Sequence, residues 1–391
     1  MADVTTTGGQ YGFNIGNQQF TMRGLQISDA VTGINQIWDW GWTYQGLTIT
    51  NCTTAISIAT GGSSAQAVGS VVIIDSTIED TQVFVDTAWG SSTFSNGSLW
   101  LENVELNNVP TAVSDDGNSV LAGTSGTTTI AGWGQGHSYT PDGPNNFQGA
   151  LTPATRPSSL LASGTSNYYT QTKPQYEASP VASFLSVRTA GASGDGTTDD
   201  TEALNAAFKS AAAAGQIVYI DQGTYLVSST LFVPSGSQIV GESYPVILAS
   251  GSNFANINDP TVLVQIGNAG ESGSIQWSDT IVGTQGSTPG AILIQFNLAA
   301  TEGSGIWDVH ARIGGFDGSN LQVGNCPTSA AVSTTCEAAY LTFWIPSYAS
   351  NAYLENVWLW TADHDLDDPS STQISVYTGR GLLVEGSNIW L

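Results

Sequence analysis

The sequence predicts an all-β protein that folds as a right-handed parallel β-helix, and its composition and internal repeats carry this prediction. Of its 391 residues, 45 are glycine, 40% are hydrophobic and only 10% are charged. Such a chain has enough apolar side chains to fold, and its glycine content is typical of turn-rich all-β proteins. A two-strand unit recurs at offsets of 22, 29 and 28 residues. This spacing suits the coils of a β-helix, because each coil buries its inward side chains against its neighbours.

The repeat aligns four segments, each a short alternating strand, a polar turn and a second short strand. They read LQISDAVTGI at 25–34, LTITNCTTAI at 47–56, STIEDTQVFV at 76–85 and VELNNVPTAV at 104–113. Their turns place Asp29, Asn51, Asp80 and Asn108 at matching positions, where stacked short polar side chains can satisfy backbone groups. A β-sandwich also has short strands at regular spacing, but it does not explain the repetition of whole two-strand units.

The second half of the chain begins with a predicted helix. Asp199, Asp200 and Thr201 cap the segment 201–214, and Gly215 ends it. Strands are expected at 216–220, 225–233 and 237–241. Between 118 and 183 the repeat stops, and the abundance of Gly, Pro, Ser and Asn predicts a long loop or linker. Because a solenoid must close its ends, we expect that the chain, which shows no terminal cap, is a fragment of a longer polypeptide.

The charge balance excludes several classes of partner. Seven Lys and Arg against 32 Asp and Glu give a net charge of −25. So few cations cannot neutralise nucleic-acid phosphates, and the negative charge repels anionic membranes. No apolar run is long enough to span a bilayer. His137, His310 and His364 show no paired spacing, so neither a metal nor another cofactor is expected.

Several motifs are specific enough to indicate a family. The runs 191-GASGDGTTDDTEALNAAF and 215-GQIVYIDQGTYLVSSTLFVPSGSQIVG resemble the opening cap of the pectate-lyase-like β-helix superfamily. The segments 16–43, 160–177, 353–368 and 379–391 resemble glycoside hydrolase family 55, mainly fungal exo-β-1,3-glucanases with two tandem β-helices and an active site between them. The resemblance implies that 1–117 are the latter coils of the first β-helix. It makes 118–183 a linker, and 184–391 the capping helix and early coils of the second β-helix.

Glutamine and tryptophan side chains gather in the first β-helix. Neutral sugars need apolar faces for stacking and amides for their hydroxyl groups. Gln18, Gln19, Trp38 and Trp40 are therefore candidate substrate ligands. The resemblance implies that Gln36 and a residue near Thr60 hold the attacking water, and that the general acid is a glutamate past Leu391. The alternatives are an amide ladder inside the coils and a core role for the tryptophans.

A second group lies in the segment 353-YLENVWLWTADHDLDD. Trp360 offers a stacking platform, and Asp363, His364 and Asp365 are candidate sugar-hydroxyl ligands. These aspartates could equally form a turn at a coil corner. Glu385 is either a ligand or an outward, solvated residue, the second being favoured.

The three cysteines permit one disulfide. Cys326 and Cys336 lie close together in a polar loop and are predicted to pair, the alternative being two free loop thiols. Cys52, in an alternating run, is expected to be a small buried hydrophobe. Asn51 and Asn96 match the glycosylation triplet, which is a weak signal.

These observations predict part of a secreted, monomeric exo-β-1,3-glucanase that releases glucose from a neutral β-glucan, with inversion. One alternative is a pectin-active lyase or galacturonase on the same fold. A polyanion groove is hard to build from seven cations, namely Arg23, Arg156, Lys173, Arg188, Lys209, Arg312 and Arg380. The other alternative is a carbohydrate-binding or truncated β-helix without activity.

Overall fold

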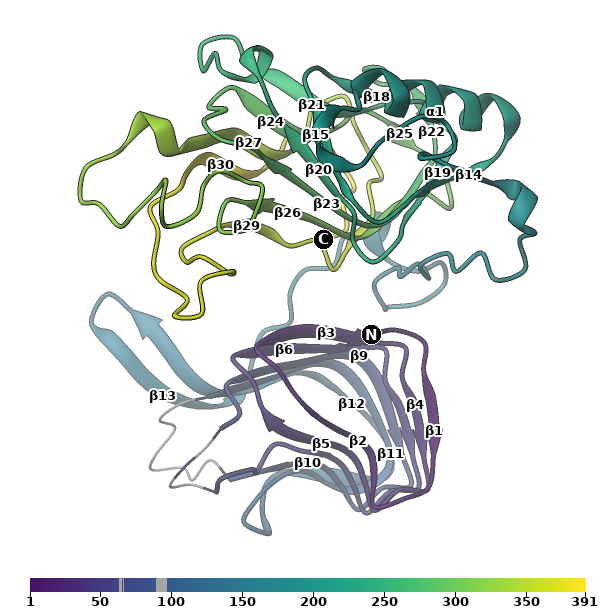
Figure 1. Ribbon diagram of the computed structural model, residues 1–391. Helices are drawn as coiled ribbons and strands as arrows, with labels where there is room; N and C mark the ends of the chain where they lie inside the picture. The colour runs from purple at the N-terminus through teal and green to yellow at the C-terminus, as the bar shows by residue number, and fades with distance from the viewer. Residues whose placement is uncertain (63–64, 66, 89–96) are drawn as a thin grey trace. The chain divides into compact units, whose positions relative to one another are not determined.

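The structure is a computed structural model that describes residues 1–391 except 63–64, 66 and 89–96. The chain forms two compact units, Met1–Thr172 and Lys173–Leu391 (Figure 1). This division lies inside the segment 118–183 that was predicted to link the two β-helices. Among the described residues, no helix is both long and apolar enough to cross a membrane.

Unit 1 is a parallel β-helix, as predicted. Its first eleven strands pair with one another only in parallel, coil over coil. The strands of this unit are β1 (Thr5–Thr7), β2 (Tyr11–Gly16), β3 (Gln19–Arg23), β4 (Gln26–Ser28), β5 (Thr32–Trp38), β6 (Gly41–Gln45), β7 (Thr48–Thr50), β8 (Thr54–Ser57), β9 (Ser70–Glu79), β10 (Val83–Thr87), β11 (Ser98–Asp115), β12 (Asn118–Thr140) and β13 (Gly143–Ala150).

The predicted repeat is the stacking register of these coils. Ile27 pairs with Ile49, Ile49 with Ile78, and Ile78 with Leu106. All four side chains are buried at 2% exposure or less. The offsets found in the sequence are therefore the lengths of successive coils, and the inward apolar side chains form a continuous column.

The polar turn positions form a ladder on the outside of the coils. Asp29, Asn51, Asp80 and Asn108 all have φ between +47° and +60°. Asn and Asp tolerate this left-handed conformation better than other residues with a Cβ atom. The Nδ2 groups of Asn51 and Asn108 donate to Oδ1 of Asp29 and Asp80, each at 2.7 Å. The expected stacking of these side chains is confirmed.

Asn108→Ala is expected to lower the free energy of unfolding by about 2 kcal/mol, because left-handed strain adds to the lost hydrogen bond. Asn108→Gly removes the same hydrogen bond without strain and should lose about half as much. Urea unfolding followed by tryptophan fluorescence measures both variants. Equal losses would show that the backbone conformation does not contribute.

The segment 118–150 corrects the prediction of a linker. β12 runs antiparallel along β11, and β13 runs antiparallel along β12. The first turn holds Asp116 and Gly117, both with positive φ (+48° and +77°), between the paired residues Asp115 and Asn118. Asp-Gly is a strong hairpin signal that the glycine-rich composition concealed. Only 151–183 is irregular, with the 3-10 turns η1 (Ser158–Leu160) and η2 (Val181–Ser183).

The first part of this irregular segment is held against the coils of unit 1 by an arginine. The guanidinium of Arg156 lies 2.5 Å from Oδ1 of Asp75 and 2.7 Å from Oε1 of Glu102. It also stacks over the ring of Tyr168, 4.4 Å from the ring centroid. The backbone N–H of Tyr168 donates to the second oxygen of Asp75 at 2.8 Å. Residues 156–168 are thus fixed on the outside of the coils.

Unit 2 contains the predicted helix α1 (Thr201–Ala214) and a second parallel β-helix. Its strands are β14 (Phe184–Ser186), β15 (Asp195–Asp199), β16 (Ile217–Ile220), β17 (Thr224–Val227), β18 (Leu231–Val233), β19 (Ser237–Gly241), β20 (Val246–Ala249), β21 (Thr261–Ile266), β22 (Ser272–Gly273), β23 (Ile275–Thr284), β24 (Ala291–Phe296), β25 (Ala299–Ala300), β26 (Gly305–Ile313), β27 (Glu337–Ile345), β28 (Leu354–Glu355), β29 (Leu359–Thr361) and β30 (Tyr377–Val384). The remaining turns are η3 (Ser252–Phe254) and η4 (Thr334–Cys336).

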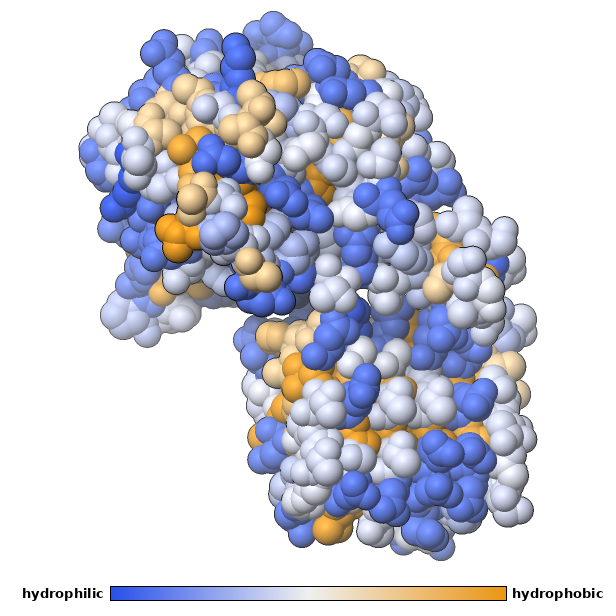
Figure 2. Space-filling model, turned by 90° about the vertical axis from the view of Figure 1, so that its right-hand side faces the viewer, coloured by the Kyte–Doolittle hydropathy of each residue, from blue (hydrophilic) through white to orange (hydrophobic). Residues whose placement is uncertain are grey.

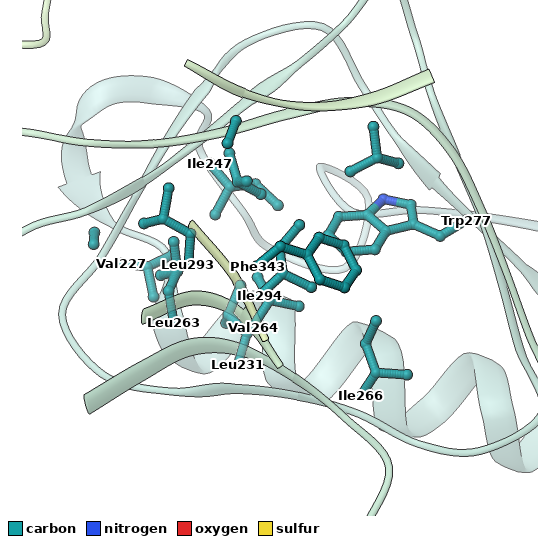
Figure 3. Close-up of a cluster of buried hydrophobic side chains, with 14 of the residues drawn as sticks. Val227, Leu231, Ile247, Leu263, Val264, Ile266, Trp277, Leu293, Ile294 and Phe343 are labelled. Carbon is teal, nitrogen blue, oxygen red and sulfur yellow. The ribbon is translucent and has the colours of Figure 1, made fainter. Parts of the chain in front are cut away.

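The apolar face of α1 packs on the core of unit 2. Leu204 and Phe208 are buried there with inward side chains of the first coils, and Figure 3 shows the neighbouring cluster around Trp277 and Phe343. Gly215 ends the helix in the left-handed conformation, as predicted. The predicted cap is corrected in one respect. Asp200 makes no side-chain cap, because its carboxylate accepts the N–H groups of residues 193 and 194.

The predicted disulfide is confirmed. Cys326 and Cys336 are bonded and buried in the connection between β26 and β27. Cys52 is a buried free thiol, as expected. Of the two glycosylation triplets, Asn51 lies exposed in the ladder, whereas Asn96 lies outside the described residues. Figure 2 shows that one face of the molecule is mainly hydrophilic to neutral, with apolar residues in scattered patches.

Candidate functional site

The tryptophan-rich turn between β5 and β6 is the first candidate, in unit 1. Trp40 is 62% exposed, and Trp38 is partly buried. The carbonyl oxygen of Gln18 accepts the backbone N–H groups of Trp40 at 2.8 Å and of Gly41 at 3.1 Å. Gln18 and Gln19 are exposed. The structure therefore brings the predicted sugar ligands of unit 1 together at two adjacent turns, one between β2 and β3 and one between β5 and β6.

Gln36 lies beneath this turn and not on its surface. Its side chain is fully buried, and its Nε2 donates to Oδ2 of Asp39 at 3.1 Å. The hydroxyl of Tyr44 donates to Oε1 of Gln36. Thr60 does lie beside Gln36, but its hydroxyl donates to the backbone carbonyl oxygen at 3.2 Å. This amide is enclosed in the coil interior, which is the alternative that the sequence left open for Gln36, and its role in holding a water stays a prediction.

Asp39 is a site residue that the sequence reasoning missed. It is 3% exposed, and its Oδ1 accepts the N–H of Gly69 at 2.9 Å. Burial raises the pKa of Asp39 to about 6, although the hydrogen bonds from Gly69 and Gln36 oppose this shift. The signal in the sequence was an isolated acid between two tryptophans, in IWDWGW at 37–42. In the structure, the hydrogen bond from Gly69 to Asp39 joins this turn to the next coil.

An aromatic row on unit 2 is the second candidate. We define this row as Tyr244, His310, Trp358, Trp360 and His364. Successive ring centroids lie 5.5, 6.3, 5.1 and 5.4 Å apart. The row follows from parallel pairing of β26 with β29, which sets Ala311 opposite Leu359. Trp358 is 49% exposed.

Hydrogen bonds fix both histidines of the row. The backbone N–H of Trp358 donates to Nδ1 of His310 at 3.1 Å, which requires this nitrogen to be unprotonated. Burial lowers the pKa of His310, so the neutral ring is favoured. His364 pairs through Nδ1 with the exposed carboxylate of Asp363 at 2.7 Å. The predicted group of Trp360, Asp363 and His364 is thus brought together on the surface.

Asp365 and Glu385 do not join this group. Asp365 is 2% exposed, and its carboxylate accepts the N–H groups of Val323 at 3.0 Å and of Asp367 at 3.1 Å. It anchors a loop, which is the alternative that the sequence left equally open for this aspartate. Glu385 is exposed and accepts the indole N–H of Trp344 at 2.8 Å. It is the outward residue that the sequence favoured.

Comparison with known proteins finds one matching family model and several relatives. The family model described as rhamnogalacturonase A/epimerase, pectate lyase-like, matches residues 1–57 and 184–284. A glucan 1,3-beta-glucosidase of Cochliobolus carbonum is 53% identical over 397 residues, covering 100% of this chain and 50% of the relative. A probable glucan endo-1,3-beta-glucosidase of Arthroderma benhamiae is 34% identical over 497 residues, covering 100% and 56%.

A further relative, the non-secreted LysM effector LysM15 of Penicillium expansum, is 37% identical over 405 residues, covering 100% of this chain and 28% of the relative. The chain thus spans about half the length, or less, of these curated relatives. With 53% identity over its whole length, the chain is similar to about half of a glucan 1,3-beta-glucosidase, and each of its units is a parallel β-helix, in agreement with the resemblance to glycoside hydrolase family 55.

Proposed function

We propose that this chain is part of an enzyme that hydrolyses β-1,3-glucan from a chain end, releasing glucose with inversion. The aromatic row of unit 2 is the observation that carries the proposal. It places stacking rings beside hydroxyl-binding groups, the combination that a neutral pyranose requires. The names of the relatives in Cochliobolus carbonum and Arthroderma benhamiae support a 1,3-linked glucan as the substrate.

The cations argue against a pectin-like polyanion. Arg23, Arg156 and Lys173 are all ion-paired with carboxylates of their own unit. Lys173 pairs with two carboxylates, those of Asp279 at 2.5 Å and Asp308 at 2.7 Å. Three of the seven cations are therefore neutralised internally. The others are too few to hold a run of uronate carboxylates, although the matching family model is named for a pectin-active enzyme.

The proposal is tested with the whole enzyme of which this chain is part, by measuring glucose release from laminarin beside product release from polygalacturonate. Glucose from laminarin alone is the expected result. Unsaturated uronides would establish the pectin-active alternative. Laminarin binding without turnover would make the chain a carbohydrate-binding β-helix.

Trp358→Ala is expected to weaken laminarin binding about tenfold, or roughly 1.4 kcal/mol. It removes an exposed stacking ring of the row, and a buried aromatic contact is worth this much or more. Isothermal titration calorimetry measures the change. Tyr139→Ala is the matched control, because Tyr139 is 78% exposed and lies in unit 1, outside the row. A similar loss in both variants would remove the row from the binding surface.

We also propose that the protein works outside the cell as a monomer. The Cys326–Cys336 disulfide supports an oxidising compartment. Immunoblotting of culture medium and lysate tests the location, and sedimentation tests the monomer. Finding the protein only in the lysate would place it with the relative whose name describes it as non-secreted.

A further inference from the structure

Arg312 lies beside the aromatic row. In the parallel pairing of β26 with β29, Arg312 is directly opposite Trp360. Paired residues of parallel strands project from the same face of the sheet. The Arg312 side chain therefore leaves the sheet on the face that carries Trp358 and Trp360. Its guanidinium carbon lies 4.2 Å from the ring centroid of Phe316, which is buried beneath it.

This guanidinium has an unusual environment for a protein so poor in cations. Its Nε is buried and has no hydrogen-bond partner among the described residues. No carboxylate within the described part of the chain lies within ion-pair distance, in contrast to Arg23, Arg156 and Lys173. Burial lowers the pKa of Arg312, and the charge of Asp367 only partly opposes this. One oxygen of Asp367 instead accepts the backbone N–H of Asp317 at 2.5 Å.

An enclosed donor without a partner lowers the stability of a fold. Its presence beside a surface of stacking rings therefore indicates a ligand that accepts its hydrogen bond. The planar guanidinium carries five N–H donors in a fixed fork and can serve two oxygens at once. Phe316 holds this fork from one face, which limits the rotamers that a ligand must fix. Arg312 is therefore a preorganised donor at the edge of the row.

We infer that Arg312 is a sugar-binding residue, whose guanidinium donates to hydroxyl oxygens of a neutral hexose stacked on Trp358 and Trp360. This inference rests on the proposed function, because it assigns a polar anchor to the same glucan surface. A neutral ligand is favoured over an anionic one because Asp363 and Asp367 are both exposed on the loop that follows β29. Their charges repel carboxylate or sulfate groups.

The test compares laminarin affinity for the wild-type chain, Arg312→Met and Arg312→Lys by calorimetry. We expect Arg312→Met to bind at least tenfold more weakly. Arg312→Lys should be intermediate, because lysine keeps the charge and loses the planar fork. Arg188→Met is the matched control, since Arg188 is exposed and donates to a backbone carbonyl oxygen away from the row. It should bind as the wild type does.

A thermal scan separates this role from a structural one. Arg312 forms no ion pair with any described residue, so Arg312→Met should keep or raise the melting temperature while binding weakens. A binding loss that tracks a lower melting temperature would overturn the inference. So would unchanged affinity in Arg312→Met while Trp358→Ala is impaired, an outcome that leaves the proposed function standing. If polygalacturonate displaced laminarin from the wild type but not from Arg312→Met, the inference that the ligand of Arg312 is neutral would be overturned. No laminarin binding by the wild-type chain would instead refute the proposed function.

Discussion

Arg156→Met is expected to lower the free energy of unfolding of unit 1 by about 3–5 kcal/mol, the range measured when one partner of a buried ion pair is removed. The side chains of Asp75 and Glu102 are 2% and 6% exposed, so water cannot replace the guanidinium. The cation also stacks on Tyr168. The variant therefore leaves two enclosed carboxylates without a counter-charge and loosens the segment that Arg156 holds.

Urea unfolding gives the energy, and amide hydrogen exchange of residues 156–172 shows whether this segment opens first. Lys209→Met is the matched control, because it removes one exposed cation from α1 and should change stability by less than about 0.5 kcal/mol. A triple variant that adds Asp75→Asn and Glu102→Gln should recover most of the loss, since no enclosed charge remains. Asparagine suits position 75, where φ is +52°. An Arg156→Met variant as stable as the control would show that the carboxylates are solvated.

The coils were predictable because their signal is local. Alternating apolar residues mark each strand, and a short polar turn marks where the strand ends. These local signals define the repeating unit, and similar units then stack on one another. The pairing of Ile27 with Ile49 is therefore implicit in the sequence. The antiparallel strands β12 and β13 were hidden because glycine and serine suggest a linker. The Asp116–Gly117 turn was the local signal for a hairpin, and it is a better guide here than the glycine-rich composition.

The candidate site was predictable in residue type but not in exposure. Trp360, Asp363 and His364 could be grouped because they are neighbours in the sequence, and the structure keeps them together. Gln36 and Asp365 have the right chemistry, yet both are enclosed by hydrogen bonds. The partner of Gln36 is the nearby Asp39, whereas Asp365 is held by Val323, 42 residues away in the sequence. Arg156 and Asp75 are 81 residues apart, so their ion pair is a property of the fold alone. Arg312 has an opposite strand partner that only the coil register reveals.

Asp39→Asn is expected to remove a pH dependence of stability. An aspartate in the unfolded chain titrates near its usual value, whereas Asp39 in the folded chain has a pKa of about 6. Between these values the folded state holds the extra proton, so stability falls as pH rises from about 4 to about 6. The whole difference amounts to at most about 3 kcal/mol, at 1.36 kcal/mol for each pKa unit. Above this window both states are ionised and the penalty stays constant.

The asparagine variant keeps the shape of the carboxylic acid and its bond from Gly69. The amide of Gln36 can turn over, so that its oxygen faces the new Nδ2 and its nitrogen faces the Tyr44 hydroxyl oxygen. Relative to the wild type, Asp39→Asn should therefore gain stability steadily through this window and not change below it. Urea unfolding at pH 4, 5, 6 and 7 measures the difference. Fluorescence of Trp38 and Trp40, which flank residue 39, reports the same ionisation in the folded wild-type chain.

Asp195 supplies a control of opposite sign. Its carboxylate accepts hydrogen bonds from the backbone N–H groups of Thr198 and Thr197, and these lower its pKa. Asp195 therefore stabilises the fold above the usual aspartate pKa, and this contribution is lost as pH falls. The Asp195→Asn and Asp39→Asn variants should thus depart from the wild type in opposite directions at pH 7. A flat difference between Asp39→Asn and the wild type from pH 4 to 7 would mean that this carboxylate is ionised throughout. The turn that presents Trp40 would then be held by a charge and not by a neutral acid.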